Sequence, residues 1–472
     1  MASCATACLV PAGAAAAPST RLAVGARAVS GGTWGTAREV PGTAALNAGG
    51  QAQVGSVSCA SAGNCTAAGS YTDSSGHTQA FVVSQVRGTW GTADEVPGTA
   101  TLNTGGNAVI NSLSCGSAGN CSAAGSYTDS SLRTQAFAIS QVGGTWGTAE
   151  EVPGSATLEG AGGGAAIDSV SCASPGNCSA GGYYDTKSAT EHPLVVSQVH
   201  GTWGKAHAIP VGVGHAAAVT SVSCASAGNC SAGGYYDFPG LQAFVISQVH
   251  STWGTAKVVP RPGTGTGGYA LVTSVSCASA GNCSGAGSYT DSSLHTQAFV
   301  VSQAGGTWGT AEEVPGTATL NNGGNDAINS LSCGSAGNCS AAGSYTDSSG
   351  RTQAFAVSQV GGTWGTTEEV PGTAALNTGG NAAVSGVSCP SASNCSAGGT
   401  YQDRSGHQQA FVVSQVNGKW GTAEEVPGTA ALNTGGNAGI GPVSCTAAGN
   451  CSASGSYTDR SGHLQAFIVN QT

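Results

Sequence analysis

One short segment that carries a carboxylate, hydroxyls and a basic side chain recurs along this 472-residue chain. It reads Tyr-x-Asp-x-Ser-Gly-His, with arginine in place of histidine in some copies, and the first copy runs from Tyr71 to His77. A ring of such basic side chains could attract an acidic ligand. The same residue types also build a turn, because aspartate accepts backbone hydrogen bonds and glycine adopts positive φ. The candidate ligand-face residues are Asp73, His77, Arg133, His295, Arg351, His407 and His463.

Pairs of neighbouring carboxylates form a second repeated feature. They are Asp94-Glu95, Glu150-Glu151, Glu312-Glu313, Glu368-Glu369 and Glu424-Glu425. Glycoside hydrolases use two carboxylates that flank one sugar bond, whereas neighbours on a strand point to opposite faces of the sheet. Charges on an outermost strand also discourage edge-to-edge aggregation. We therefore interpret these pairs as edge protection.

The residues that do not repeat concentrate in the third to fifth repeats. His207 and His215 flank a shortened connector there, and Lys257 follows in the next repeat. A specialised site at these residues would make the chain an extracellular glycoside hydrolase or lyase, although drift in tolerant loops explains the same irregularity. The sequence contains no P-loop, Rossmann glycine fingerprint or metal-binding helix. No catalytic, metal-binding or cofactor-binding residues are predicted.

Sixteen of the 18 cysteines fall into eight C-x5-C pairs. Each pair flanks a predicted hairpin turn of five residues, which brings the two Cα atoms to bridging distance. Metal binding would require two pairs to converge on one ion, but successive pairs lie a whole repeat apart. We predict eight structural disulfides, which are typical of an oxidising location. They are Cys59–Cys65, Cys115–Cys121, Cys172–Cys178, Cys224–Cys230, Cys277–Cys283, Cys333–Cys339, Cys389–Cys395 and Cys445–Cys451.

The elements that position these residues are predicted from the repeat itself. The eight tryptophans, from Trp34 to Trp420, follow one another at steps of about 55 residues. Each repeat holds four short strand candidates separated by turn residues. In the sixth repeat they are Asn329–Cys333, Cys339–Tyr345, Gln353–Val360 and Thr363–Val370. A connector rich in glycine leads to the next repeat and should lie on the same face as the Tyr71–His77 turns.

The two ends of the chain complement each other. Residues 33–40 read as a fourth strand without the first three, and the last repeat holds three strands without a fourth. Joined, they complete eight units, as in a ring closed by its termini. The predicted fold is all-β, an eight-bladed β-propeller of four-stranded antiparallel blades over residues 29–472. A β-solenoid is the alternative architecture.

Composition and charge restrict the class of protein and its partners. Glycine supplies 77 of the 472 residues and charged residues only 8 %, which argues against collagen, a helical protein and a disordered chain. Residues 1–28 have a short apolar core and small residues, and they predict a signal peptide or leader. The sequence has no stretch of about 20 apolar residues, so no membrane span is predicted. The net charge of −10 disfavours nucleic acid as a partner.

The repeated aspartate turn resembles the Asp-box of sialidase-like propellers. That box runs Ser-x-Asp-x-Gly-x-x-Trp, and here the turn is Asp73-Ser74-Ser75-Gly76, one residue longer, with Phe81 where an aromatic follows. The turn comes after the second strand, whereas the box usually follows the third. The catalytic arginine triad and the tyrosine nucleophile of sialidases have no counterpart that we can map. The VSC-xSAxxC-xAxG pattern is similar to secreted repeat propellers of high-GC Gram-positive bacteria.

Together these features predict a secreted, monomeric propeller that acts as an extracellular binding or interaction module. Carbohydrate or another cell-surface polymer is the expected ligand class, because near-identical blades would present the same weak site several times. An extracellular glycoside hydrolase or lyase is the alternative, as is a purely structural surface protein. No cofactor is expected.

Overall fold

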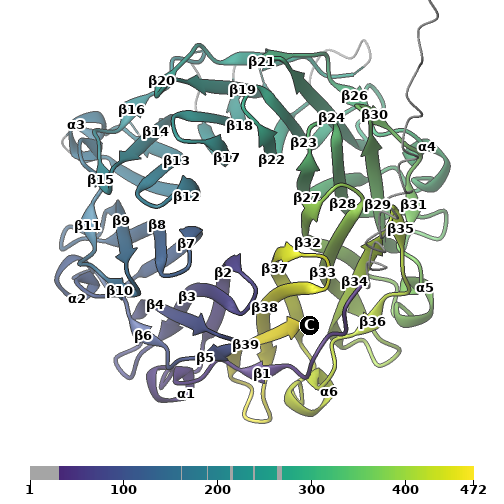
Figure 1. Cartoon of the computed structure of the whole chain (residues 1–472), viewed down its shortest axis with the longest axis horizontal. Helices are drawn as coiled ribbons and strands as arrows, with labels where there is room; N and C mark the ends of the chain where they lie inside the picture. Colours follow the sequence, from purple (N-terminus) through teal and green to yellow (C-terminus); the bar gives the residue numbers. More distant parts are fainter. Residues whose placement is uncertain (1–30, 161, 189, 213–215, 238–239, 263–267) are drawn as a thin grey trace, which may run out of the picture.

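Eight antiparallel sheets form a closed ring around a central axis (Figure 1). The computed structural model describes residues 31–472 apart from 161, 189, 213–215, 238–239 and 263–267. The predicted leader at 1–28, and with it Cys4 and Cys8, lies outside the described residues, as does His215. The eight-bladed propeller predicted from the repeat is confirmed. Among the described residues, no helix is long and apolar enough to cross a membrane.

Each blade begins with the strand nearest the axis; seven blades end with two short outer strands and the last blade with one. The first four blades consist of β2 (Ala52–Ser61), β3 (Asn64–Thr72), β4 (Thr78–Val86), β5 (Thr89–Trp90) and β6 (Asp94–Glu95); β7 (Ala108–Ser117), β8 (Asn120–Thr128), β9 (Thr134–Val142), β10 (Thr145–Trp146) and β11 (Glu150–Glu151); β12 (Gly164–Ser174), β13 (Asn177–Asp185), β14 (Glu191–Val199), β15 (Thr202–Trp203) and β16 (His207–Ala208); β17 (Ala217–Ser226), β18 (Asn229–Asp237), β19 (Leu241–Val249), β20 (Thr252–Trp253) and β21 (Lys257–Val259).

The other four blades repeat this order. They consist of β22 (Ala270–Ser279), β23 (Asn282–Thr290), β24 (Thr296–Ala304), β25 (Thr307–Trp308) and β26 (Glu312–Glu313); β27 (Asp326–Ser335), β28 (Asn338–Thr346), β29 (Thr352–Val360), β30 (Thr363–Trp364) and β31 (Glu368–Glu369); β32 (Ala382–Ser391), β33 (Asn394–Gln402), β34 (Gln408–Val416), β35 (Lys419–Trp420) and β36 (Glu424–Glu425); β37 (Ala438–Ala447), β38 (Asn450–Thr458), β39 (Leu464–Gln471) and the N-terminal β1 (Arg38–Glu39).

The N-terminal strand completes the last blade. β1 pairs with β39 in antiparallel register, with Arg38 opposite Ile468, and Trp34 forms a further bridge to Gln471. This pairing removes the open edge that β39 would otherwise expose. The predicted closure of the ring by the two chain ends is therefore confirmed.

The hydrophobic core lies between blades. Phe355 and Trp364 of blade 6 pack in one buried cluster with Ala298 and Val300 of blade 5. Both faces of the middle strands are covered in this way, which explains why runs such as Ala354–Val357 lack polar alternation. Burial against the neighbouring blade is what lets such short strands form a stable ring.

The structure corrects two boundaries predicted from the sequence. The fourth strand of the sixth repeat, predicted over Thr363–Val370, divides into β30 and β31, which pair separately with β29. The first hairpin, predicted to turn over five residues, turns over two, because β27 and β28 continue to Ser335 and from Asn338. Gly337 adopts φ +70° in this turn, a conformation that favours glycine.

The connectors between blades contain single helical turns that the repeat did not reveal. These helices are α1 (Thr43–Leu46), α2 (Thr99–Leu102), α3 (Ser155–Glu159), α4 (Thr317–Leu320), α5 (Thr373–Leu376) and α6 (Thr429–Leu432). In α5 the Thr373 hydroxyl donates to the Val370 carbonyl at 2.7 Å, which holds the start of the turn. The apolar Val370 beside it is buried, so each connector is anchored at the outer rim.

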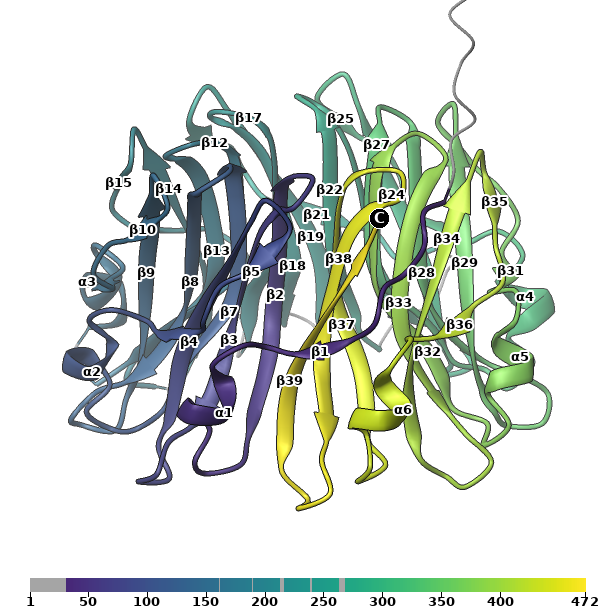
Figure 2. The same ribbon diagram turned by 60° about the horizontal axis from the view of Figure 1, so that its bottom comes forward.

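The loops divide between two faces of the ring. We call the face that carries the Asp73–His77 turn, its equivalents and the connectors the turn face (Figure 2). Thr78 N–H donates to the carbonyl of Gly106 in the connector, which confirms that turn and connector adjoin. We call the opposite face, with the Ser61–Asn64 hairpin and its equivalents, the disulfide face.

All eight C-x5-C pairs form disulfides on that face. Cys333 lies directly opposite Cys339 in the pairing of β27 with β28, with a Cα–Cα distance of 3.9 Å. Each bond therefore links two paired strands and does not close an open loop. The eight bonds are Cys59–Cys65, Cys115–Cys121, Cys172–Cys178, Cys224–Cys230, Cys277–Cys283, Cys333–Cys339, Cys389–Cys395 and Cys445–Cys451.

The serine before the first cysteine of each disulfide, which in six of the eight blades follows another serine two residues earlier, links the innermost strands. The Ser56 hydroxyl accepts a hydrogen bond from Leu113 N–H, and the Ser58 hydroxyl accepts one from Cys115 N–H, each at 3.0 Å. Backbone amides of the inner strands, which have no further strand to pair with, are satisfied in this way. The repeated serines are therefore structural.

Candidate functional site

The repeated aspartate holds its own turn on the turn face. Oδ1 of Asp73 accepts hydrogen bonds from the N–H groups of Ser75 at 2.8 Å and His77 at 3.0 Å. Its Oδ2 accepts one from Nε2 of Gln79 at 3.0 Å. Partial burial opposes ionisation, but these three donors together lower the pKa of Asp73. Asp291, Asp347, Asp403 and Asp459 make the same three contacts.

In five of the six turns the basic residue at the end packs on a glycine of the connector. A Cβ atom placed on Gly106 would lie 2.7 Å from Cδ2 of His77, so only glycine leaves room for the imidazole. A Cβ atom placed on the preceding Gly105 would lie 2.4 Å from Cγ2 of Thr128 in the next blade. The glycine pair of the connector thus fits between the turns of two successive blades.

The candidate ligand-face residues lie on six blades, one basic residue to each. His77, His407 and His463 are exposed, and the His295 side chain is 54 % exposed. Arg133 differs, since its guanidinium pairs with Asp129 at 2.8 Å in its own turn. The fold therefore distributes these residues around the turn face and does not gather them into one pocket.

The second carboxylate of each acidic pair has a structural partner that the sequence did not indicate. Oε2 of Glu95 accepts a hydrogen bond from the Tyr71 hydroxyl at 3.1 Å. Burial and this carboxylate raise the pKa of Tyr71. The same bond joins Tyr127 to Glu151, Tyr289 to Glu313, Tyr345 to Glu369, Tyr401 to Glu425 and Tyr457 to Glu39.

The irregular blades place their unusual residues apart. His207 is exposed on the outer strand β16, and the Lys257 ammonium on β21 donates to the carbonyl of Trp308. Asp168 lies at the bulge of the inner strand β12, where burial and the charge of Glu191 raise its pKa to about 7. No group of three or more metal-ligating side chains suited to an ion occurs in the part of the chain that the structure describes.

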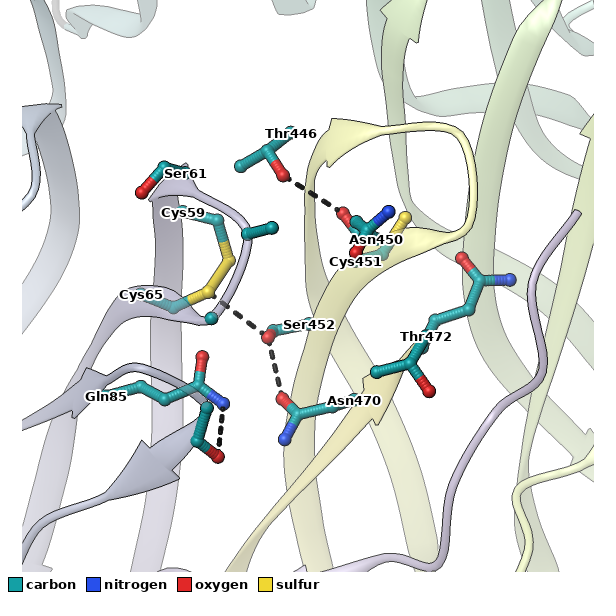
Figure 3. A pocket seen from close by; sticks show the side chains of 14 residues that line it. Cys59, Ser61, Cys65, Gln85, Thr446, Asn450, Cys451, Ser452, Asn470 and Thr472 are labelled. Carbon is teal, nitrogen blue, oxygen red and sulfur yellow. Dashed lines mark hydrogen bonds between the residues drawn. A yellow bond between two sulfur atoms is a disulfide. The ribbon is translucent and has the colours of Figure 1, made fainter. Parts of the chain in front are cut away.

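Hollows between adjacent blades open on the disulfide face. The hollow between blades 1 and 2 has a volume of about 360 Å³, and the one between blades 2 and 3 about 320 Å³. A smaller hollow of about 80 Å³ lies between blades 8 and 1 (Figure 3). Glutamine, serine, asparagine and disulfide atoms recur in their walls, so the repeat builds a similar hollow at several interfaces.

A glutamine–serine network joins the blades beneath these hollows. In blade 3, Nε2 of Gln198 donates to the Ser140 hydroxyl of blade 2 at 2.7 Å, and Oε1 accepts from the Ser122 hydroxyl at 3.0 Å. The glutamine oxygen is satisfied by the equivalent serine at five further interfaces. These pairs are Ser179–Gln248, Ser231–Gln303, Ser284–Gln359, Ser340–Gln415 and Ser396–Gln471.

Two glutamine oxygens in this network accept no hydrogen bond. Oε1 of Gln141 faces an interface where Thr66 replaces the serine, and Thr66 does not donate to it. Oε1 of Gln85 is left over because the Ser452 hydroxyl donates instead to Asn470, at 2.8 Å (Figure 3). Both glutamines are at most 4 % exposed. Sequence reasoning missed them; the signal was that Thr66 and Asn470 break an otherwise repeated serine pattern.

The known proteins that this chain matches are similar to it in structure only. No protein-family model matches the chain. No curated protein matches it. Similar solved structures include a protein of unknown function from Dyadobacter fermentans (13 % identity, 64 % of this chain and 94 % of that chain, TM-score 0.38). An ulvan lyase of a polysaccharide lyase family (10 %, 74 % and 89 %, TM-score 0.42) and the Trypanosoma rangeli sialidase (10 %, 80 % and 55 %, TM-score 0.37) are also similar.

Proposed function

We propose that the chain is a monomeric extracellular binding module that holds an acidic carbohydrate polymer on its turn face. The observation that supports this most is the repetition of one exposed basic side chain, in one turn geometry, on five blades, with the half-buried Arg133 at the equivalent position of a sixth. Arginine and protonated histidine both attract carboxylate or sulfate groups. Eight disulfides suit an oxidising compartment outside the cytosol.

The turns provide sites that are weak singly and strong together. Five of the six basic side chains pack against a connector glycine, and the Asp turn holds the backbone beneath them, so little side-chain entropy is lost on binding. A polymer with acidic groups at regular intervals engages several turns at once, and its apparent affinity rises without any new contact. The overall charge of −10 means that attraction must come from these local groups.

The test replaces the four histidines of the turn face. A variant carrying His77→Asn, His295→Asn, His407→Asn and His463→Asn should bind acidic polysaccharides at least about tenfold more weakly on a glycan array. Neutral polysaccharides on the same array should show no such loss.

The matched control uses the same residue type on the opposite face. His200 and His250 are exposed in turns of the disulfide face, at φ +48° and +49°, so both are replaced by asparagine. This control should bind like the wild type. Equal binding by the wild type and the quadruple variant would contradict the proposal, as would an array on which the wild type binds no acidic polysaccharide.

A further inference from the structure

The basic residues of the turn face belong to six blades that are neighbours in the ring. Around the ring these are blades 5, 6, 7, 8, 1 and 2, because closure places blade 8 beside blade 1 (Figure 1). Two groups that lie far apart in the sequence thus become one arc. Each member directly precedes the third strand of its blade. We call these six residues the basic arc: His295, Arg351, His407, His463, His77 and Arg133.

Glycine pairs in the connectors link successive turns of the basic arc. A Cβ atom placed on Gly436 would lie 2.7 Å from Cδ2 of His407 in blade 7. One placed on Gly435 would lie 2.4 Å from Cγ2 of Thr458 in blade 8. Five glycine pairs hold the six turns side by side through this double contact. The other four pairs are Gly49-Gly50, Gly105-Gly106, Gly323-Gly324 and Gly379-Gly380.

Backbone pairing marks the same five junctions between blades. At each of them a parallel bridge joins the first residue of a third strand to the connector that follows. These bridges are Thr296–Asn325, Thr352–Asn381, Gln408–Asn437, Leu464–Gln51 and Thr78–Asn107. Among the described residues, the junctions of blade 3 with blade 2, of blade 3 with blade 4 and of blade 4 with blade 5 have no such bridge. The basic arc is therefore one continuous structural unit with two ends.

Blades 3 and 4 interrupt the arc and reverse its charge. Thr190 and Gly240 precede β14 and β19, in the place of a basic residue. Three carboxylates stand at the strand ends beside these turns, where the six blades of the arc have uncharged residues. They are Asp185, Glu191 and Asp237. Lys187 is exposed in the turn of blade 3, but in the chain it stands between two of these carboxylates. An acidic ligand is repelled by this part of the turn face.

We propose that the acidic polymer is a linear chain that follows the basic arc from blade 5 to blade 2. The proposal rests on the function proposed above and adds to it the form and the path of the ligand. A chain held at one turn keeps its next acidic group close to the next basic residue, so each added unit raises the affinity. An acidic monosaccharide reaches one turn only and binds weakly.

Oligomers that cover part of the arc test the order of the turns. An oligomer that spans three turns has four positions along an arc of six. Removing the basic residue of blade 5, at one end, leaves three of these positions. Removing that of blade 7 or blade 8, at the centre, leaves only one. Turns that act independently would lose the same amount of binding wherever the residue is removed.

The experiment compares His407→Asn and His463→Asn with His295→Asn. All three replace an exposed histidine at the same position of the turn. The reference chain and each variant also carry Arg404→Ser and Arg460→Ser, because these exposed arginines belong to the turns of blades 7 and 8 alone. Binding of galacturonate oligomers and of heparin oligomers of defined length is measured by calorimetry on the full chain.

The reference chain should bind the longest oligomers at least about tenfold more tightly than the shortest. At lengths below the one that gives the highest affinity, His407→Asn and His463→Asn should each bind about threefold more weakly than His295→Asn. Equal weakening in the three variants, or no gain with length, overturns the arc but leaves the binding of acidic polymers in place. A wild type that binds neither kind of oligomer nor the two parent polymers overturns both proposals.

Discussion

The two faces of the ring differ in how their polar groups are satisfied. On the turn face each turn aspartate bonds to its own turn, as Asp73 does with Ser75, His77 and Gln79. On the disulfide face the blades are joined by neutral glutamine and serine side chains, yet Gln85 and Gln141 each leave a buried oxygen without a partner. The repeated aspartates therefore build the fold, whereas the two unpaired glutamine oxygens mark departures from the repeat.

Removing one disulfide should have the largest effect on stability. Cys333→Ala with Cys339→Ala deletes the bond that links β27 to β28 on the disulfide face. Such a bond constrains the unfolded chain, so its loss should lower the free energy of unfolding by about 2 kcal/mol, measured by urea titration. An unchanged transition midpoint would show that the strand pairing alone holds this face.

Asp168 is the exception on the inner strands, and its replacement should stabilise the protein. Asn111 and Asn329 occupy the equivalent bulge and donate to Ile167 and Val384 carbonyls of the next blade, at 2.9 and 2.8 Å. Asp168→Asn supplies such a donor and removes a buried charge. The expected gain at pH 8 is on the order of 2 kcal/mol.

The same variant should change the pH dependence of stability. Since burial raises the pKa of Asp168 to about 7, the folded wild type retains a proton that the unfolded chain has lost above about pH 4. Its free energy of unfolding should therefore fall as pH rises from about 4 to 7, and Asp168→Asn should flatten that fall. Parallel curves for the two proteins would contradict this account.

A turn aspartate in the same blade as the deleted disulfide allows a direct comparison of the faces. Asp347→Ala removes three hydrogen bonds from the turn face of blade 6, but the turn is partly exposed. The cost should be about 1 kcal/mol in urea unfolding, below that of the disulfide. Hydrogen bonds lower the pKa of Asp347, and the bond from Gln353 contributes most. The stability lost in Asp347→Ala should therefore shrink as pH falls through this lowered pKa. A cost above that of the disulfide would reverse the comparison.

Restoring the glutamine–serine network should have the smallest effect on the free energy of unfolding. Thr66→Ser pairs the oxygen of Gln141 and should raise the free energy of unfolding by about 0.5–1 kcal/mol. Ser122→Thr should lower it by a similar amount. If both variants destabilise the protein, the unpaired Oε1 of Gln141 does not account for a difference in stability between the interfaces.

The sequence predicted the fold because the repeat constrains every blade in the same way. Phased tryptophans, C-x5-C pairs and complementary ends together define eight blades, their disulfides and the closure by residues 33–40. The division of the fourth strand and the helical turns in the connectors were not predicted. Both depend on contacts with the neighbouring blade, such as the anchoring of Val370, which a single repeat does not contain.

The candidate site was predicted less well for a related reason. The repeated motif pointed to the aspartate turns, and the structure shows what each aspartate and glycine does there. The motif did not point to Gln141, because a glutamine that recurs in every blade looks structural until its partner is known. Only the geometry shows that two of the eight equivalent oxygens, those of Gln85 and Gln141, are left unpaired.

The most direct test compares histidine replacements on the two faces. Acidic polysaccharide binding is determined under one set of conditions for the wild type, for the quadruple variant of His77, His295, His407 and His463, and for the variant of His200 and His250. The two-face account predicts that the quadruple variant loses the polysaccharide and that the disulfide-face variant binds it like the wild type. Equal binding by all three proteins, or equal loss in both variants, would contradict it.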